Sequence, residues 1–120
     1  MPLLFAYGTL IDPVQRAAVL QGAPSHVLGT GTVCGALYDL GAYPALVEGG
    51  ASGRVPGVLI ELPDASALAR LDEYEGVAEN LYRRSRAPVR LEDGHQMEAW
   101  VYWYCGSVEG LQRIDVWRPA

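Results

Sequence analysis

Lysine is absent from this 120-residue chain, and all nine of its basic residues are arginine. Without lysine there is no Schiff-base amine and no P-loop lysine, so both of these chemistries are excluded. Acidic residues outnumber basic ones, and the net charge is −5. The one basic concentration, at residues 83–90, is predicted to cover a strand face, and we expect no nucleic-acid partner for an acidic domain of this kind.

Cysteine, histidine and long apolar runs are also scarce. The two cysteines, Cys34 and Cys105, are far apart in the sequence and indicate reduced, partly buried thiols in a cytoplasmic protein. His26 and His95 fall in or beside predicted turns, which favours neither a cysteine nucleophile nor a metal site, and no cofactor is expected. No apolar run approaches the ~20 residues that span a bilayer, so no membrane partner is expected.

Apolar residues make up 50% of the chain, which suits the core of one domain over residues 1–120. Asp12 followed by Pro13 is typical of a helix start and predicts a helix over residues 12–21, and a second helix is expected over 64–75. Asp93 and Gly94 predict a hairpin turn. Strands are expected at residues 3–7, within 26–47, and at 54–61, 81–91 and 96–104.

This order of elements predicts the fold class. Strands and helices do not alternate regularly, which excludes a doubly wound parallel sheet. Many strands with glycine bends and only two helices predict an α+β fold, in which a mixed, curved sheet closes into a small barrel with two main flanking helices. The tail from residue 106 shows no clear periodicity.

Glu75 is the first candidate functional residue. It continues the helical spacing of Ala65, Leu68 and Leu71, which predicts a carboxylate on the inward face of the second helix. Loss of water and the negative end of the helix dipole would both raise its pKa toward the range useful for proton transfer near neutrality. A surface glutamate at a helix end is an equally good interpretation of the spacing alone.

The segment from Tyr7 to Leu10 is the second candidate, because it joins the first predicted strand to the first helix. Gly8 allows a tight turn, and the amides that follow it point outward and can bind an anion. The structural alternative is a plain tight turn with a buried Tyr7. Four residues of this kind do not distinguish the two interpretations.

Five segments together point to a known family. They occur in the right order between residues 3 and 104, and their combination is more specific than any one of them. The segments are Phe5–Pro13, Tyr43–Val47, Val55–Leu59, Leu71–Gly76 with Leu81–Arg84 after it, and Ala99–Tyr102. In these segments the chain resembles the γ-glutamylcyclotransferase-like superfamily, and most closely its avirulence-induced-gene-like branch.

The resemblance implies a small barrel with a cavity at the glycine-containing loop. It implies an enzyme of the carbon–nitrogen lyase or acyltransferase kind, which cyclises a γ-glutamyl group to 5-oxoproline and releases an amine or amino acid. It assigns general acid–base catalysis to Glu75. The residues it assigns to substrate binding are Tyr7, Gly8, Thr9, Leu10, Tyr82 and Tyr102, with Tyr104 as the alternative to Tyr102.

The chain departs from the family pattern at two places. Residues 77–80 lack a proline that is often found there, which leaves the shape of this loop open. Thr9 stands where the glutathione-acting branch has serine, which argues against assuming glutathione as the substrate. A non-catalytic binding or regulatory module for a small carboxylated metabolite is the alternative hypothesis. A Glu75 carboxylate that shares a pocket with the loop favours the enzyme, whereas a surface ion pair with Arg83 or Arg84 favours the alternative.

Overall fold

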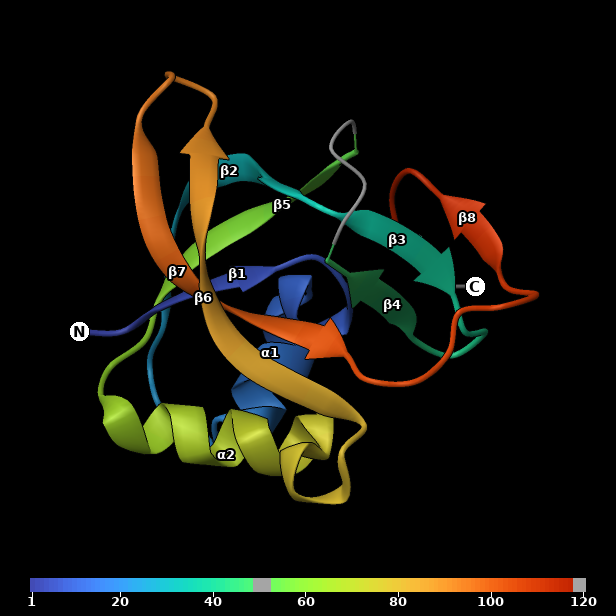
Figure 1. Ribbon diagram of the computed structural model, residues 1–120. Coiled ribbons are helices and arrows are strands. Elements are labelled where there is room, and N and C mark those ends of the chain that lie inside the picture. The colour runs from blue at the N-terminus through green and yellow to red at the C-terminus, as the bar shows by residue number, and fades with distance from the viewer. Residues whose placement is uncertain (49–52, 118–120) are drawn as a thin grey trace.

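The computed structural model describes residues 1–48 and 53–117. Figure 1 shows a strand-rich body with helices packed along one side. In chain order the elements are β1 (Leu3–Ala6), η1 (Thr9–Ile11), α1 (Pro13–Val19), β2 (His26–Cys34), β3 (Ala36–Asp39), β4 (Pro44–Val47), β5 (Arg54–Glu61), α2 (Ala65–Glu75), η2 (Val77–Glu79), β6 (Tyr82–Leu91), β7 (Gln96–Tyr104) and β8 (Gln112–Ile114).

Five strands close into a barrel in the order β1-β5-β2-β6-β7. Closure comes from a parallel contact between Leu4 of β1 and Trp100 of β7, whereas the other pairs are antiparallel. The barrel is therefore mixed, and with α1 and α2 beside it this confirms the predicted α+β class (Figure 1).

A second, three-stranded sheet in the order β4-β3-β8 lies next to the barrel (Figure 1). Strand β8 was not predicted, since its three residues are mostly exposed and show no alternation. It forms because the tail folds back and pairs antiparallel with β3, joining Ile114 to Leu37. Beyond it, Trp117 is buried in the barrel core.

The two α-helices, α1 and α2, each start at an aspartate cap. Asp12 accepts a hydrogen bond from the Val14 amide at 2.9 Å, and Asp64 accepts one from the Ala67 amide at 3.2 Å. The inward face of α2 is formed by Ala67, Leu68 and Leu71. The predicted inward position of Ala65 is wrong, because this residue begins the helix right after its cap and is exposed.

Strand β1 separates two apolar clusters, because its side chains alternate between the two faces of the sheet. Phe5 belongs to the cluster of the barrel core, whereas Leu4 and Ala6 pack in the cluster that contains the inward residues of α2. Tyr102 of β7 belongs to the second cluster. The site described below therefore forms at one end of β1, where the two clusters meet.

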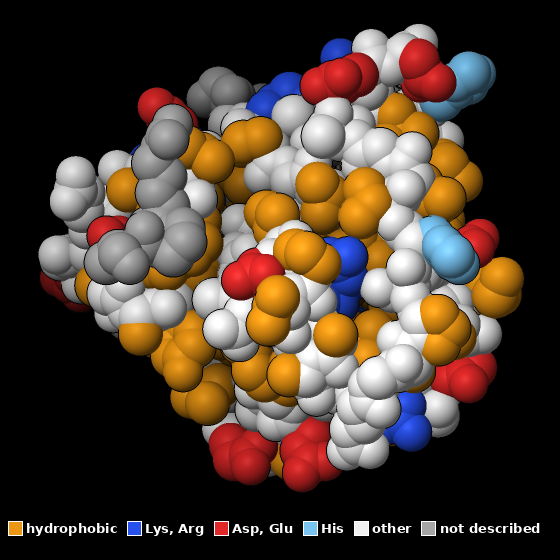
Figure 2. Space-filling view, turned by 180° about the vertical axis from the view of Figure 1, so that it is seen from behind, with side chains coloured by type: hydrophobic (Ala, Val, Ile, Leu, Met, Phe, Trp, Pro, Cys, Tyr) orange, Lys and Arg blue, Asp and Glu red, His pale blue; other side chains and the backbone are white. Residues whose placement is uncertain are grey.

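The surface differs from one sequence expectation. Cys34 and Cys105 are free thiols and both are exposed, so their predicted partial burial is wrong; each lies at or just past the end of a strand. Figure 2 shows the molecule from behind, with hydrophobic side chains over the middle of this face and acidic ones mainly near its edges. None of the helices in the described residues has the length and apolarity needed to cross a membrane.

Candidate active site

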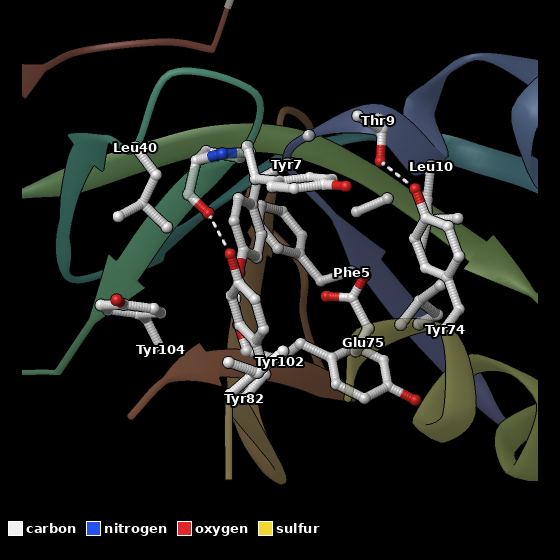
Figure 3. Close-up of a pocket in the computed structure, with 16 residues that line it drawn as sticks. Phe5, Tyr7, Thr9, Leu10, Leu40, Tyr74, Glu75, Tyr82, Tyr102 and Tyr104 are labelled. Carbon is white, nitrogen blue, oxygen red and sulfur yellow. Dashed lines mark hydrogen bonds between the residues drawn. The ribbon is translucent and has the colours of Figure 1, made fainter. Parts of the chain in front are cut away.

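A cavity of about 300 Å³ opens where the β1–η1 loop, the end of α2, the ends of β6 and β7, and the β3–β4 loop meet (Figure 3). Its walls are mostly apolar and aromatic. The lining residues are Leu4, Phe5, Ala6, Tyr7, Gly8, Thr9, Leu10, Leu40, Tyr43, Pro44, Tyr74, Glu75, Leu81, Tyr82, Tyr102 and Tyr104. All seven residues that the sequence analysis proposed for the site are in this set.

Glu75 is the one acidic or basic side chain in the cavity wall as the structure describes it. Its carboxylate points into the cavity from the last residue of α2 (Figure 3). Burial raises the pKa of Glu75 from 4.5 to about 7. Over residues 1–48 and 53–117 this carboxylate has no hydrogen-bond or ion-pair partner, so desolvation is not compensated and the acid is half protonated near neutrality.

The end of α2 is shaped by Gly76. This glycine takes the left-handed conformation, with φ of 70°, and a side chain there would meet Leu81 Cδ1 at 2.7 Å. The helix therefore ends at Glu75, and the chain turns directly into η2 and then β6. This turn brings Leu81 and Tyr82 to the same cavity as Glu75.

The two arginines that could have paired with Glu75 bind elsewhere. Arg84 Nε and Nη2 lie 2.8 and 3.2 Å from the two carboxylate oxygens of Asp72. Arg83 pairs with Glu48 on the surface. The surface ion pair that would have favoured the non-catalytic alternative is therefore not formed in the described part of the chain.

The loop after β1 forms part of the cavity wall and carries unpaired backbone amides. It is held as a turn by the Ile11 amide, which donates to Gly8 O at 3.0 Å, and by the Asp12 amide, which donates to Thr9 O at 3.2 Å. The amides of Gly8, Thr9 and Leu10 have no partner within the described residues. Unpaired amides on a cavity wall can bind a carboxylate or an oxyanion.

Gly8 is needed for packing as well as for the turn. A Cβ atom on Gly8 would lie 2.7 Å from Pro44 Cγ, which is closer than real contacts allow. Pro44 begins β4 and also lines the cavity. The glycine therefore lets the loop lie against the second sheet and closes that side of the pocket.

Two buried tyrosines, Tyr7 and Tyr102, and the half-buried Tyr82 have hydroxyl protons that already form hydrogen bonds. Tyr7 donates to the backbone oxygen of Tyr102, Tyr82 donates to Pro44 O at 2.7 Å, and Tyr102 donates to Asp72 Oδ1 at 2.7 Å. Burial is the largest cause that raises the pKa of each, so all three stay protonated. Their oxygens can still accept hydrogen bonds from a ligand.

Several cavity residues were not identified from the sequence. Tyr74 precedes Glu75, and its hydroxyl lies 3.1 Å from Thr9 Oγ1 across the cavity (Figure 3). Its place beside Glu75 was the available signal. Leu40 and Tyr43 come from the β3–β4 loop, where no periodicity marks an inward side chain. Tyr104, by contrast, was the alternative to Tyr102 in the sequence analysis, and both line the cavity.

The small closed barrel thus has a cavity in which an unpaired acid lies beside a loop with unpaired amides. The family model described as "Gamma-glutamyl cyclotransferase, AIG2-like" matches residues 4–118. This chain belongs to that family, which confirms the resemblance seen in its sequence.

Individual relatives agree with this assignment. A Vibrio cholerae protein named "Putative gamma-glutamylcyclotransferase" is 40% identical over 104 residues, which cover 85% of this chain and 81% of the relative. Among solved structures, an AIG2-like protein from Mus musculus has a TM-score of 0.81 at 23% identity, covering 98% of this chain and 88% of the other. Protein ytfP from Escherichia coli has a TM-score of 0.68 at 29% identity, covering 95% and 92%. The mouse structure shows a shared fold.

Proposed function

We propose that this protein is a γ-glutamylcyclotransferase in which Glu75 is the general acid–base. The observation that carries the proposal is the unpaired Glu75 carboxylate, with a pKa of about 7, in the same cavity as the free amides of Gly8, Thr9 and Leu10. Family membership supports the reaction class. The cytoplasmic location stays a prediction.

In the proposed mechanism the α-carboxylate of the γ-glutamyl group binds to the loop amides. The α-ammonium then lies near Glu75, where buried tyrosine oxygens can accept its remaining N–H groups. Glu75 takes a proton from the ammonium, and the free amine attacks the γ-carbonyl carbon. As the tetrahedral intermediate collapses, the bond between the γ-carbon and the departing nitrogen breaks, and Glu75 returns the proton to that nitrogen. Glu75 then takes the extra proton of the ring nitrogen and passes it to the released amine, so that a neutral lactam and an ammonium leave and Glu75 is again ionised.

The reaction needs no nucleophile from the protein, because the substrate supplies its own amine. The contribution of the cavity is to hold amine and carbonyl in ring-closing geometry, which gives large effective molarities in intramolecular reactions. A cavity of about 300 Å³ with mostly apolar walls is of a size suited to a small-molecule substrate such as a γ-glutamyl compound.

The donors for the developing oxyanion follow from the hydrogen bonds already present. Tyr7, Tyr82 and Tyr102 have committed their protons to other acceptors. Among the described residues the unpaired donors on the wall include the amides of Gly8, Thr9 and Leu10, and we propose that one of these stabilises the oxyanion.

The test is to incubate the protein with a panel of γ-glutamyl amines and γ-glutamyl dipeptides and to follow 5-oxoproline. On a substrate that is turned over, we expect Glu75→Gln to lower kcat by about 10²–10⁴-fold, the usual contribution of general acid–base catalysis. Glu73→Gln is the matched control, since Glu73 is an exposed residue of the same helix.

Two outcomes would contradict the proposal. Turnover at the parent rate in Glu75→Gln would remove the acid–base assignment. Binding of the panel compounds without any 5-oxoproline would favour the non-catalytic module for a carboxylated metabolite.

A further inference from the structure

Arg16 of α1 is a buried cation without an acidic partner. It is 7% exposed, and in the described parts of the chain no carboxylate forms an ion pair with it. Its Nε donates to Ser25 Oγ at 2.9 Å, and its Nη1 donates to Leu10 O at 3.0 Å and to Ile11 O at 3.2 Å. Burying an unpaired charge is costly, so the position of this guanidinium calls for a physical reason.

The bond to Leu10 O starts a relay of hydrogen-bonded peptide groups. The Leu10 carbonyl shares its peptide group with the Ile11 amide, and this amide donates to Gly8 O at 3.0 Å. The Gly8 carbonyl shares its peptide group with the Thr9 amide, which has no partner in the described chain. Because the described peptide bonds are not cis, the carbonyl and the N–H of each group point in opposite directions, and the relay runs from Arg16 to Thr9 N–H.

The bond to Ile11 O starts a second relay of the same kind. The Ile11 carbonyl shares its peptide group with the Asp12 amide, which donates to Thr9 O at 3.2 Å. The Thr9 carbonyl in turn shares its peptide group with the Leu10 amide, which is also free. Arg16 Nη1 is therefore the first donor of both relays. One relay ends at the unpaired amide of Thr9 and the other at that of Leu10, both in the loop that lines the cavity.

Hydrogen bonds in a chain polarise one another, and a charged donor at the head strengthens the whole chain. The two terminal amides are thus better donors, particularly toward an anion. Arg16 also fixes the two carbonyls at the end of η1, which holds the turn in shape.

We propose that Arg16 is the positioning residue of the carboxylate subsite, acting through the two peptide relays on the amides of Thr9 and Leu10 without touching the ligand. This rests on the proposed binding of a carboxylate at the loop. It explains how a cavity whose described wall has no cation of its own can bind an anion beside Glu75. The positive charge lies behind the loop.

The experiment compares two probes that differ in charge at one group, L-5-oxoproline and its neutral amide L-5-oxoprolinamide. Their Kd values are measured by calorimetry for the parent, Arg16→Gln and Arg16→Lys. We expect Arg16→Gln to weaken 5-oxoproline binding roughly tenfold and to change the Kd of the amide little, since hydrogen bonds to ionised groups are about twice as strong as neutral ones. Arg16→Lys keeps the charge and should retain most of the preference.

Two further variants serve as controls. Arg90→Gln removes the same charge from an exposed position on β6, and Ser25→Ala removes one partner of Arg16 but neither relay. Both should keep the parent preference for the carboxylate. A partly unfolded variant lowers the binding stoichiometry for both probes alike, so the ratio of the two Kd values still reports on the site.

Two results with Arg16→Gln would overturn the inference. An equal rise in the Kd of both probes would show a merely structural role for Arg16. A parent-like preference for 5-oxoproline over its amide would show that Arg16 does not act on the carboxylate subsite. Either result would leave the proposed function intact, because the parent would still bind the product. A parent that does not prefer 5-oxoproline over its amide would instead count against the carboxylate subsite and therefore against both proposals.

Discussion

Two carboxylates lie one helical turn apart on α2, and their surroundings are opposite. Asp72 receives two hydrogen bonds from Arg84 and one from Tyr102, at distances between 2.7 and 3.2 Å. Glu75 has no such partner in the described structure, and burial raises its pKa to about 7. Both side chains are carboxylates on the same helix, so the difference between them comes from the groups that lie opposite each one.

The partners of Asp72 come from the strands opposite the helix. Arg84 of β6 and Tyr102 of β7 are directly paired in the antiparallel ladder, and together they bind one carboxylate. Glu75 lies one turn further on, where the wall is made of tyrosines with committed protons and of the loop after β1. Asp72 is thereby suited to hold structure, and Glu75 is suited to exchange a proton.

The largest expected effect concerns stability, because the Glu75 pKa is higher in the folded chain than its ordinary value of 4.5. Below pH 4.5 the Glu75 carboxyl group is protonated in both the folded and the unfolded state, and it costs the folded state no stability. As the pH rises to about 7, the group ionises in the unfolded chain before it ionises in the folded chain. The free energy of unfolding therefore falls over this range. The full penalty above pH 7 is about 3 kcal/mol, since one pKa unit is about 1.4 kcal/mol.

Glu75→Gln removes this penalty. Relative to the parent, the free energy of unfolding of the variant should rise by about 3 kcal/mol between pH 4 and pH 8. Urea unfolding at both pH values measures it. A difference between variant and parent that does not change with pH would mean that Glu75 is solvated like a surface residue.

The pH dependence of the rate sharpens the comparison further. The proposed mechanism needs the ionised form of Glu75, so kcat/KM should rise about tenfold per pH unit below 7 and level off above it. Asp72→Asn should keep the inflection near pH 7, because the Glu75 pKa is raised by burial and not by Asp72. If Asp72→Asn lost the inflection, the group that titrates near pH 7 would be Asp72 and not Glu75.

Asp72→Asn should act on stability in the direction opposite to Glu75→Gln. It leaves the partly buried Arg84 guanidinium without its acidic partner and disturbs the Tyr102 hydroxyl, a loss of about 1–3 kcal/mol in the free energy of unfolding. Denaturant unfolding at pH 8 compares the two variants. Glu73→Gln, at an exposed position, is the control, and its free energy of unfolding should stay within about 0.5 kcal/mol of that of the parent. A neutral Asp72→Asn would contradict the structural role.

Tyr102→Phe should have the smallest effect. It removes one of the three hydrogen bonds to Asp72 and keeps the ring in the apolar cluster, so about 0.5–1.5 kcal/mol is expected. The bond from Tyr7 to the Tyr102 backbone oxygen is unaffected. The same unfolding measurement checks this, and a loss larger than that of Asp72→Asn would place the main support of the network at Tyr102.

Much of the fold was predictable because its signals are local. The cap at Asp12, the proline after it and the hairpin at Asp93 and Gly94 depend on neighbouring residues, and each element forms near the expected place. Strand β8 could not be found in this way, because its pairing with β3 joins residues far apart in the chain. The exposure of the cysteines likewise depends on where strands end in the barrel.

By itself the sequence determined the two helices, most of the strands, the family, and the place of Glu75 at the end of the second helix. Helical periodicity and turn residues act over a few positions, and this makes them readable from the chain. Only the tertiary structure decided that Arg84 binds Asp72 and leaves Glu75 unpaired, and that Arg16 lies behind the loop amides. Pairing and desolvation depend on which distant side chains the closed barrel brings together.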